Sequence, residues 1–518
     1  MKARIVALYL GLVCAYLMVG CSTQIPTDDE IVQKAHISES FHNMPAHGKL
    51  AHSFSTQDSK KESLDSTQNA KSKQESDKHS KKEADKEAES PYFTQFKSFI
   101  HDKSLHSLIE LSLENNTEVL TLISRIQQAK SQAKINTASM LPTLNAGLNS
   151  SYIDRRTLSQ TTAIRPGANS VNANLSMSWE LDLFGKLNAL RQSSKKDYLK
   201  AQSNLAYAQL SLIAEVSTLY FTLRDNAHAL SLAKNTLENL QKIQAINAEK
   251  LRFGLIDMTT YQTSVANTTT QKNNYETLLY TFEQNKNALL VLLNVNLADL
   301  NDRVDLLDSS YTFPSIATPH IEKLPSEIIL SRPDIQANIL ALHSQLYKET
   351  NANASRLPGI SLSGSIGEIL YSTNGAGSLI FQIANSITAP LLNRTSLKQN
   401  YLIQQELSKE AYYTLQNSIN TALSEIENAL FNAQSKKRQT QNTQDSYQVG
   451  LQAYESNSAK SARGLLDSSE FLTQENTYLN LQTQLFSAQT DEILSLITLF
   501  KALGGNLALD TSAQEAQE

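Results

Sequence analysis

The sequence predicts an α+β membrane protein in which a sheet with one apolar face continues into very long helices. Between Ser170 and Leu181, apolar residues alternate with polar ones, so a strand there has one apolar and one polar face. From Leu187 to Phe253 there is no Pro and no Gly, and a helix of that span is about 100 Å long. The same succession of patterns occurs again later in the chain, which indicates a twofold internal repeat.

The composition argues against a nucleic-acid partner. The 518 residues carry a formal net charge of −5, so no basic surface for nucleic acid is expected. Only 19% of residues are charged, whereas Asn, Gln, Ser and Thr are abundant. Polar, uncharged surface of this kind suits a water-facing wall.

The N-terminus predicts a secreted, lipid-anchored chain. Residues 1–20 have a basic start and a short apolar run, which is typical of a signal peptide. The stretch Leu17-Met18-Val19-Gly20-Cys21 resembles a bacterial lipobox, with Met18 as a departure, so we expect lipidation of Cys21, palmitate included. The alternative is an ordinary cleaved signal with an incidental cysteine. Because Cys14 lies inside the signal, no disulfide or cysteine metal site is expected in the mature chain.

The next stretch, 21–90, is predicted to be a disordered polar tether that starts at the lipidated cysteine. It is rich in Lys, Ser and Glu from 59 to 90 and low in aromatic residues. Its five histidines match no compact metal site and are interpreted as solvated. After Leu17 no segment is long and apolar enough for a transmembrane helix, so a membrane crossing would need strands closed into a barrel.

The remaining chain divides into a first repeat at 91–310, a second repeat at 311–506 and a disordered tail at 507–518. In the first, a helical run including 105–126 stops at Leu141-Pro142, followed by a β-hairpin at 143–181, the long helix, a tip turn at 252–258 and a return helix. The second has a helix, a hairpin at 360–389 with strands at 360–366 and 381–389, a long helix, a tip turn at 462–468 and a return helix. The motif at 254–257, Gly-Leu-Ile-Asp, returns at 464–467 as Gly-Leu-Leu-Asp.

Membrane physics predicts an oligomer. Each chain offers about four strands, while transmembrane barrels of this kind have at least about eight. An open sheet in lipid would leave unpaired edges, which is costly. We therefore expect several chains to complete one barrel, with apolar strand faces toward lipid and Asn172, Asn174, Ser176 and Ser178 toward water.

Five short motifs occur in order along the chain: Trp179-Glu180-Leu181-Asp182-Leu183-Phe184-Gly185-Lys186, Leu324-Pro325-Ser326, Arg332-Pro333-Asp334-Ile335, Leu357-Pro358 and Lys501-Ala502-Leu503-Gly504-Gly505. Together they resemble the TolC-type outer-membrane efflux family, in the lipidated branch that serves resistance-nodulation-division (RND) pumps. The resemblance covers about residues 92–506; Asn393, Asn506 and the long tether depart from the usual pattern. It implies a homotrimer with a twelve-stranded transmembrane β-barrel, four strands per chain, continued by a periplasmic α-helical coiled-coil tunnel. It also implies contact with outer-membrane lipid, a periplasmic membrane-fusion adaptor protein and an inner-membrane RND transporter, with no cofactor.

By the same resemblance, both tip turns form the periplasmic gate and the adaptor-docking surface. A carboxylate near a threefold axis would become a ring of three acids, whose mutual repulsion would raise its pKa. The alternative is that Asp257 and Asp467 only begin the return helices, where acids favour the positive helix end. The candidate residues are Arg252, Gly254, Leu255, Asp257, Arg463, Gly464, Leu465, Asp467 and Glu470.

Two further groups are expected to be structural. Pro333 and Asp334 suit the first turn of a helix, so the motif with Arg332 is interpreted as a helix start, with a direct transport role as the minor alternative. Trp179 and Phe184 are expected at the membrane interface of the barrel. No catalytic motif or metal site is present in the sequence, so we predict no enzyme activity.

The resulting hypothesis is a passive outer-membrane exit channel of a tripartite multidrug pump, carrying drugs and other small amphiphiles. A type I secretion or metal-efflux channel of the same fold is one alternative. A lipid-anchored coiled-coil scaffold of the envelope, without a pore, is the other.

Overall fold

The computed structural model describes residues 90–153, 168–308, 311–316, 319–320, 325–372, 379–388, 390, 393–506 and 508–509. The predicted signal peptide, Cys21, the tether up to residue 89 and nearly all of the tail lie outside these residues. The chain divides into two compact units. The sheet unit contains 117–208 and 329–422, and the helical unit contains 90–116, 209–328 and 423–509.

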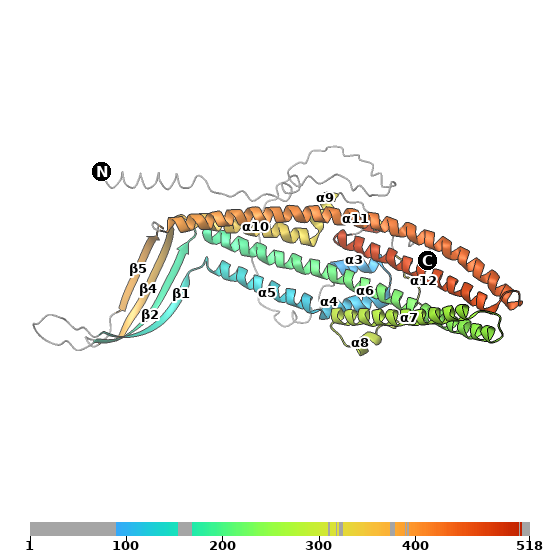
Figure 1. Ribbon diagram of the computed structural model, residues 1–518. Helices are drawn as coiled ribbons and strands as arrows, with labels where there is room; N and C mark the ends of the chain where they lie inside the picture. The colour runs from blue at the N-terminus through green and yellow to red at the C-terminus, as the bar shows by residue number, and fades with distance from the viewer. Residues whose placement is uncertain are drawn as a thin grey trace, which may run out of the picture. The chain divides into compact units, whose positions relative to one another are not determined.

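The sheet unit is built on one antiparallel sheet with the strand order β1-β2-β4-β5 (Figure 1). Strands β1 (Thr143–Ile153) and β2 (Ala168–Leu181) form one hairpin, and β4 (Gly359–Ser372) and β5 (Leu379–Thr388) form the other. All four strands overlap the alternating stretches of the sequence. Strand β4 runs further than the predicted 360–366 because it stays paired with β2 up to the partners Ser170 and Ser372.

The pairing register gives the sheet two chemically different faces. Leu175 lies opposite Ala146 and Ile366, whereas the next residue, Ser176, lies opposite Asn145 and Ser365. The apolar face is uncovered in the single chain: Leu148 is 71% exposed and Ile383 is 88% exposed. Such a face requires an apolar environment or a partner.

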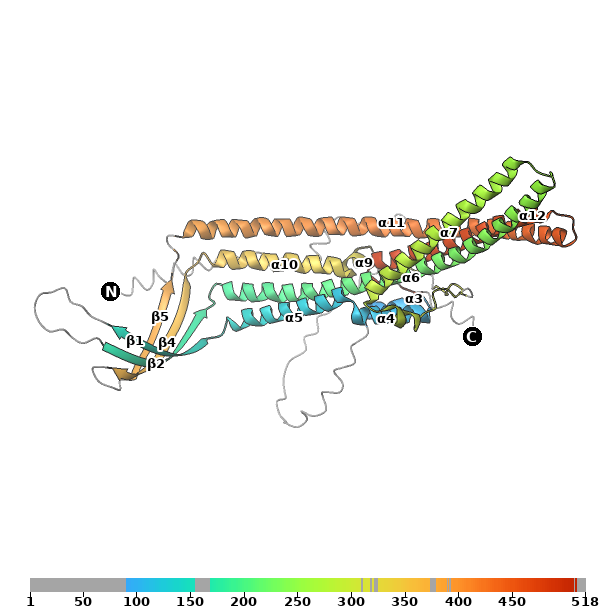
Figure 2. The ribbon, with the colours of Figure 1, turned by 60° about the horizontal axis from the view of Figure 1, so that its bottom comes forward.

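Helices α5 (Thr117–Ala138), α10 (Pro333–Ala354) and the first parts of α6 (Lys186–Arg252) and α11 (Arg394–Ala462) run side by side in the sheet unit (Figures 1 and 2). Polar side chains join neighbouring helices: the hydroxyls of Ser193 and Ser344 are 3.0 Å apart, and the Asn338 amide donates to Ser418 Oγ at 2.9 Å. Buried apolar side chains fill the contact, among them Ile335, Leu342, Leu415 and Ile419.

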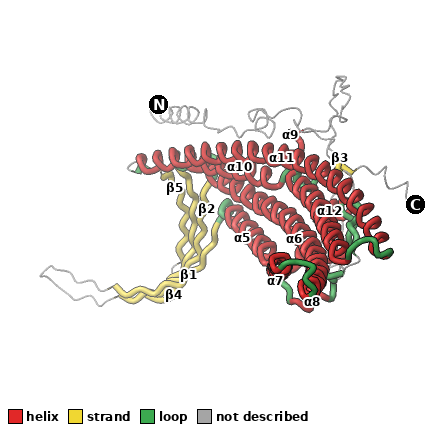
Figure 3. Tube along the Cα trace, turned by 45° about the vertical axis from the view of Figure 1, so that its right-hand side comes forward, coloured by secondary structure: helices red, strands yellow, loops and turns green. Residues whose placement is uncertain are grey.

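The helical unit contains α3 (Pro91–Phe99), α4 (Lys103–Asn115), α7 (Met258–Leu293), α8 (Leu297–Asn301), α12 (Ser468–Ala502) and the later parts of α6 and α11. Figure 1 labels α3 and α4, and Figure 3 shows α7, α8 and α12 from another side. A short helix, α9 (Pro325–Ser331), precedes α10, and two-residue strands β3 (Pro319–His320) and β6 (Ala508–Leu509) pair with each other. The Phe99 and Phe500 rings stack with centroids 5.8 Å apart, and Phe96 meets Phe500 edge-on. None of the helices in the described ranges combines the length and apolarity needed to cross a bilayer.

The two halves of the chain follow one order of elements, α5-β1-β2-α6-α7 and then α10-β4-β5-α11-α12. The long helices begin at Lys186 and Arg394 and end at Arg252 and Ala462, within a few residues of the predicted limits.

One prediction about the helices is wrong. The run around 105–126 was expected to be one helix, but it is broken at Asn116 into α4 and α5. Asn116 has an extended backbone, with ψ of 125°, and its side-chain amide donates to the carbonyl of Leu292 at 2.9 Å. The helical spacing of apolar residues continues through the break, so periodicity alone did not reveal it.

Candidate functional site at the two helix turns

The turns α6–α7 and α11–α12 have the same backbone geometry. Gly254 and Gly464 adopt φ of +71° and +69°, a left-handed conformation that glycine adopts without steric cost. In the first turn the Leu255 N–H donates to the Lys250 carbonyl at 2.8 Å, and in the second the Leu465 N–H donates to the Lys460 carbonyl at 2.9 Å. Both turns are therefore Schellman motifs, which explains the repeated Gly-Leu sequence.

An aspartate begins the return helix at each turn. Asp257 Oδ1 accepts the Thr260 N–H at 2.8 Å, and Asp467 Oδ1 accepts the Ser469 N–H at 3.1 Å. These hydrogen bonds satisfy free N–H groups at the positive end of α7 and α12. The capping role that the sequence offered for both residues is therefore present.

Asp467 has a second role, because it joins the two helical hairpins. The Lys250 ammonium, near the end of α6, donates to Asp467 Oδ2 and also to Ser469 Oγ at 3.1 Å. The pair is partly exposed, with 27% of the Lys250 side chain and 44% of the Asp467 side chain accessible. Lys250 is not among the candidate residues predicted from the sequence. Its place one turn before Gly254 is the one signal that could have indicated it.

The pKa values of both aspartates shift in the direction opposite to that expected for an acid ring. Donation by Lys250 and by the Ser469 N–H lowers the pKa of Asp467, and hydrogen bonding to Thr260 lowers the pKa of Asp257. In a single chain both carboxylates are thus stabilised in the charged form.

The remaining surface of the turns is apolar and accessible. Phe253, Leu255 and Leu465 are 67%, 72% and 73% exposed. The Arg252 guanidinium lies 4.7 Å from the Phe253 ring centroid and pairs with Glu249 at 2.7 Å. Arg463 and Glu470 are exposed next to the second turn.

A second link between α6 and α12 lies further along the helices. The Asn239 amide donates to Glu475 Oε2 at 3.0 Å and to Asn476 Oδ1 at 3.1 Å. Beside it, the Tyr454 and Tyr478 rings stack with centroids 4.6 Å apart. The sequence periodicity indicates only that these positions are helical, so it could not predict this contact between α6 and α12.

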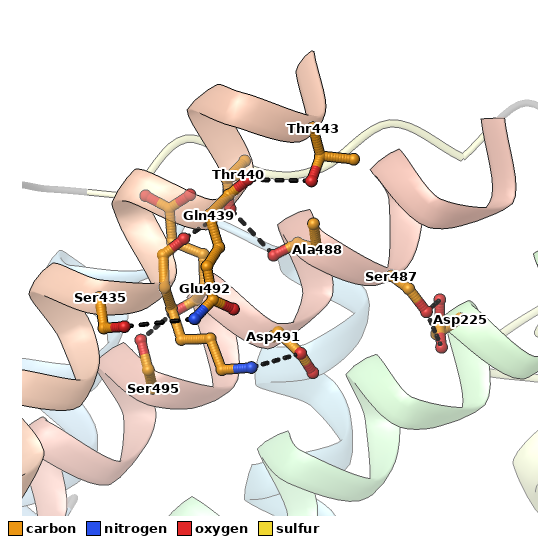
Figure 4. Close-up of polar contacts among 11 residues, drawn as sticks. Asp225, Ser435, Gln439, Thr440, Thr443, Ser487, Ala488, Asp491, Glu492 and Ser495 are labelled. Carbon is orange, nitrogen blue, oxygen red and sulfur yellow. Dashed lines mark hydrogen bonds and ion pairs between the residues drawn. The ribbon is translucent and has the colours of Figure 1, made fainter. Parts of the chain in front are cut away.

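Polar contacts also join three helices near the middle of the helical unit (Figure 4). Ser487 of α12 donates to Asp225 of α6 at 3.0 Å, and Lys436 of α11 pairs with Asp491 of α12 at 2.8 Å. Burial raises the pKa of Asp225, and the nearby charge of Asp491 adds to this. No Lys, Arg or His among the described residues forms an ion pair with Asp225.

In the sheet unit, the Trp179-to-Lys186 motif makes the junction between β2 and α6. Asp182 caps α6 by accepting from the backbone N–H groups of Leu187 and Asn188 at 3.0 and 2.8 Å. The Trp179 indole donates to the Met140 carbonyl at 2.9 Å, and Phe184 lines a cavity of 520 Å³ at the junction.

The Arg332 motif also belongs to the sheet unit. Pro333 opens α10, and the buried Arg332 guanidinium makes two hydrogen bonds to Asp334, at 3.1 and 2.8 Å. Among the residues that the structure describes, no group of His, Cys, Asp and Glu side chains could hold a metal ion.

Comparison with known proteins places this architecture in a family. The model of the outer membrane efflux protein family matches residues 108–295 and 324–505. The antibiotic efflux pump outer membrane protein ArpC of Pseudomonas putida is 28% identical over 432 residues, covering 79% of this chain and 84% of that protein. The toluene efflux pump outer membrane protein TtgC of Pseudomonas putida shows the same identity and coverage.

Solved structures agree on the fold. The crystal structure of the Campylobacter jejuni CmeC outer membrane channel matches with a TM-score of 0.68 and 24% identity, over 80% of this chain and 89% of that one. The chain belongs to the outer membrane efflux protein family. It is an outer-membrane efflux channel protein, as the resemblance in its motifs predicted, and its family consists of channels rather than enzymes.

Proposed function

We propose that this protein is the outer-membrane exit duct of an RND-type tripartite pump that removes drugs and other small amphiphiles from the cell. The observation that carries the proposal is the family match, which extends over both halves of the chain. The duct is passive; an inner-membrane RND transporter supplies the energy, and a periplasmic membrane-fusion adaptor connects the two.

In this proposal three chains close their sheets into one twelve-stranded barrel. The support is the strand order, which leaves β1 and β5 as free edges beside an exposed apolar face. Lipid would cover that face, and edge-to-edge pairing between chains would satisfy the backbone groups of both strands. The helices continue the barrel as a periplasmic tunnel, and acyl chains on Cys21, palmitate included, anchor each chain.

We propose that the two turns form the gate and the adaptor-docking surface. Exposed Phe253, Leu255 and Leu465 offer an apolar surface to a partner. The bond between Lys250 and Asp467 holds the α11–α12 hairpin against α6, and its release would let the two hairpins separate.

The names of the relatives favour drugs and solvents over the other cargoes of this fold, since they are named for antibiotics and toluene. Type I secretion or metal efflux is the alternative. Deleting the gene, in a strain without a redundant channel, should raise sensitivity to dyes, bile salts and hydrophobic antibiotics, and plasmid-borne wild type should restore resistance. Unchanged resistance, with lost protein secretion or metal tolerance instead, would contradict drug efflux.

The scaffold alternative is tested at the sheet. Leu175→Arg puts a charge on the apolar face and should cost roughly 2–4 kcal/mol if that face meets lipid at mid-bilayer depth. The adjacent Ser176→Arg puts the same charge on the polar face and is the matched control. Loss of the oligomer in membrane extracts, measured by size-exclusion chromatography, in the first variant alone would support insertion, and equal assembly of both variants would favour a scaffold without a pore.

A further inference from the structure

Among the residues that the structure describes, the polar face of the sheet carries almost no ionisable groups. The register places amides, hydroxyls and small residues side by side across all four strands. Asn149 and Asn174 are hydrogen-bonded at 3.3 Å, and the hydroxyls of Ser361 and Ser386 are 2.7 Å apart. The residues of this face are Thr143, Asn145, Gly147, Asn149, Ser151, Asn172, Asn174, Ser176, Ser178, Glu180, Gly359, Ser361, Ser363, Ser365, Gly367, Ile380, Gln382, Ala384, Ser386 and Thr388.

The Asn174 side chain lies across this face next to two glycines. Gly147 of β1 and Gly367 of β4 are its direct partners in the pairing register. A Cβ on Gly147 would come within 2.6 Å of Asn174 Oδ1, and a Cβ on Gly367 would lie 3.4 Å from Asn174 Cβ. The two glycines therefore leave the space that this amide occupies.

Glu180 is the only ionisable side chain that the described strands put on the polar face, and it is neutralised. It lies at the end of β2, and its Oε1 is 2.5 Å from the Lys186 ammonium in the first turn of α6. Both side chains are partly accessible, at 41% and 35%. They also line the 520 Å³ cavity, so their charges are close to open space rather than deep in protein.

Neutralisation matters because a lone wall charge and a charge pair act differently on a passing ion. A lone carboxylate on the wall of a narrow pore raises the local cation concentration and repels anions. Opposite charges in contact form a dipole, whose potential falls off much faster with distance. A wall of amides and hydroxyls offers hydrogen bonds to solutes of either sign.

We propose that the sheet section of the duct does not select cargo by charge, and that Lys186 keeps it so by neutralising Glu180. The proposal rests on the proposed function, with the polar face lining the pore. Its cargo is then neutral, cationic and anionic amphiphiles alike, and Glu180 and Lys186 are the residues whose loss would introduce selectivity.

The test is the reversal potential of single channels in planar bilayers under a KCl gradient. It should be run at about 0.1 M salt or below, where the Debye length is roughly 10 Å or more. Lys186→Gln should shift the reversal potential toward cation preference, and Glu180→Gln should shift it toward anion preference. The double variant Glu180→Gln/Lys186→Gln should return to the wild-type value, which simple damage to the junction would not produce.

Asn174 supplies a second, independent pair of variants. Asn174→Asp changes charge at nearly constant size and should give cation preference, while Asn174→Lys should give anion preference. Asn174→Gln changes size without charge and is the matched control, with an unchanged reversal potential. In cells, Lys186→Gln and Glu180→Gln should alter resistance to cationic dyes and anionic bile salts in opposite directions.

The outcomes separate this inference from the function on which it rests. Suppose that wild type and every single-charge variant show conductance steps with the same reversal potential. This result would contradict the inference about charge neutrality, whereas the channel function would stand. Equal shifts from Asn174→Gln and Asn174→Asp would also overturn it, because size rather than charge would then control permeation. Absence of steps from folded, inserted protein, both in wild type and in the gate variant Asp467→Asn, would overturn the channel and the inference together.

Discussion

At the scale of single residues, Lys250 and Asp467 combine a helix cap with a link between hairpins. Asp467 begins α12 as Asp257 begins α7, but only Asp467 also meets a cation from another helix. Since both partners are partly exposed, the pair contributes little to global stability, typically less than about 1 kcal/mol. Its effect is local, because it links the α6–α7 and α11–α12 hairpins next to their exposed turns.

We predict that Lys250→Gln and Asp467→Asn increase channel opening without unfolding the protein. Asn caps a helix about as well as Asp, so Asp467→Asn removes the ion pair and keeps the cap. Single-channel recordings should show larger or more frequent steps, with thermal unfolding nearly unchanged. Asp257→Asn is the matched control, since it alters a cap at a turn without breaking a link, and it should behave as wild type. Equal opening in Lys250→Gln, Asp467→Asn and Asp257→Asn would contradict a gating role for the Lys250–Asp467 ion pair.

The same pair predicts an acid response. The pKa of Asp467 is lowered in the folded chain, so the link is fully present above the ordinary aspartate pKa of about 3.9. It is lost as pH falls below that value through the lowered pKa. Wild-type opening should therefore approach that of Lys250→Gln only in this acid range. Recordings of Asp467→Asn should lack this acid-induced increase in opening. If the increase persisted in that variant, a titratable group other than Asp467 would be responsible for it.

At the scale of elements, polar contacts join α6, α11 and α12, and one of them is unfavourable at neutral pH. Asp225 is partly buried, accepts a hydrogen bond from Ser487 and lies near the like charge of Asp491. Lys436 pairs with Asp491 rather than with Asp225 (Figure 4). A partly buried carboxylate without a cation opposes packing, so this contact limits how firmly α12 holds α6.

We predict that Asp225→Asn raises the melting temperature at neutral pH. The folded pKa of Asp225 is above its ordinary value, so wild-type stability is lost as pH rises from about 3.9 through the folded pKa. The Asn variant keeps an acceptor for Ser487, and its stability does not fall with the ionisation of residue 225. Its higher melting temperature relative to wild type should therefore disappear near pH 4. Melting curves of detergent-purified protein at several pH values check this, with exposed Asp445→Asn on α11 as the control. A lower melting temperature for Asp225→Asn at every pH would contradict the cost assigned to the buried charge.

At the scale of the whole molecule, the sheet is incomplete in one chain. Strands β1 and β5 are its edges, and its apolar face is exposed. Closure with further copies of the chain would remove both costs at once, so we expect oligomerisation and membrane insertion to be one event.

We predict that β1 of one chain lies beside β5 of the next. The folded part contains no cysteine, since the two in the chain are Cys14 and Cys21. Leu148→Cys combined with Ile383→Cys, treated with a bifunctional thiol reagent in membranes, should give covalent dimers and trimers. Leu175→Cys with Ile366→Cys is the matched control: these residues are direct partners within one chain and should cross-link without a change in mass. Products larger than a trimer, or none, would contradict a closed ring of three.

The sequence by itself determined the four strands of the sheet, the two long helices with their return helices, and the order of these elements. Alternation along β2, the uninterrupted stretch of α6 and the two Gly-Leu turns are local features, and each depends on residues close together in the chain. Because a left-handed turn needs glycine and a helix start favours aspartate, the turns could be located to within a few residues. The five motifs are also short and contiguous, so their residues alone were enough to indicate the family.

Only the tertiary structure decided which residues meet. Lys250 and Asp467 lie far apart in the chain, and so do Asn116 and the Leu292 carbonyl whose hydrogen bond accompanies the break between α4 and α5. The neutral polar face likewise depends on a register that aligns β1, β2, β4 and β5, since a slip of one residue would exchange the faces. Periodicity fixes which side of an element is apolar; the partner on the other element depends on packing between distant segments, which a local pattern does not encode.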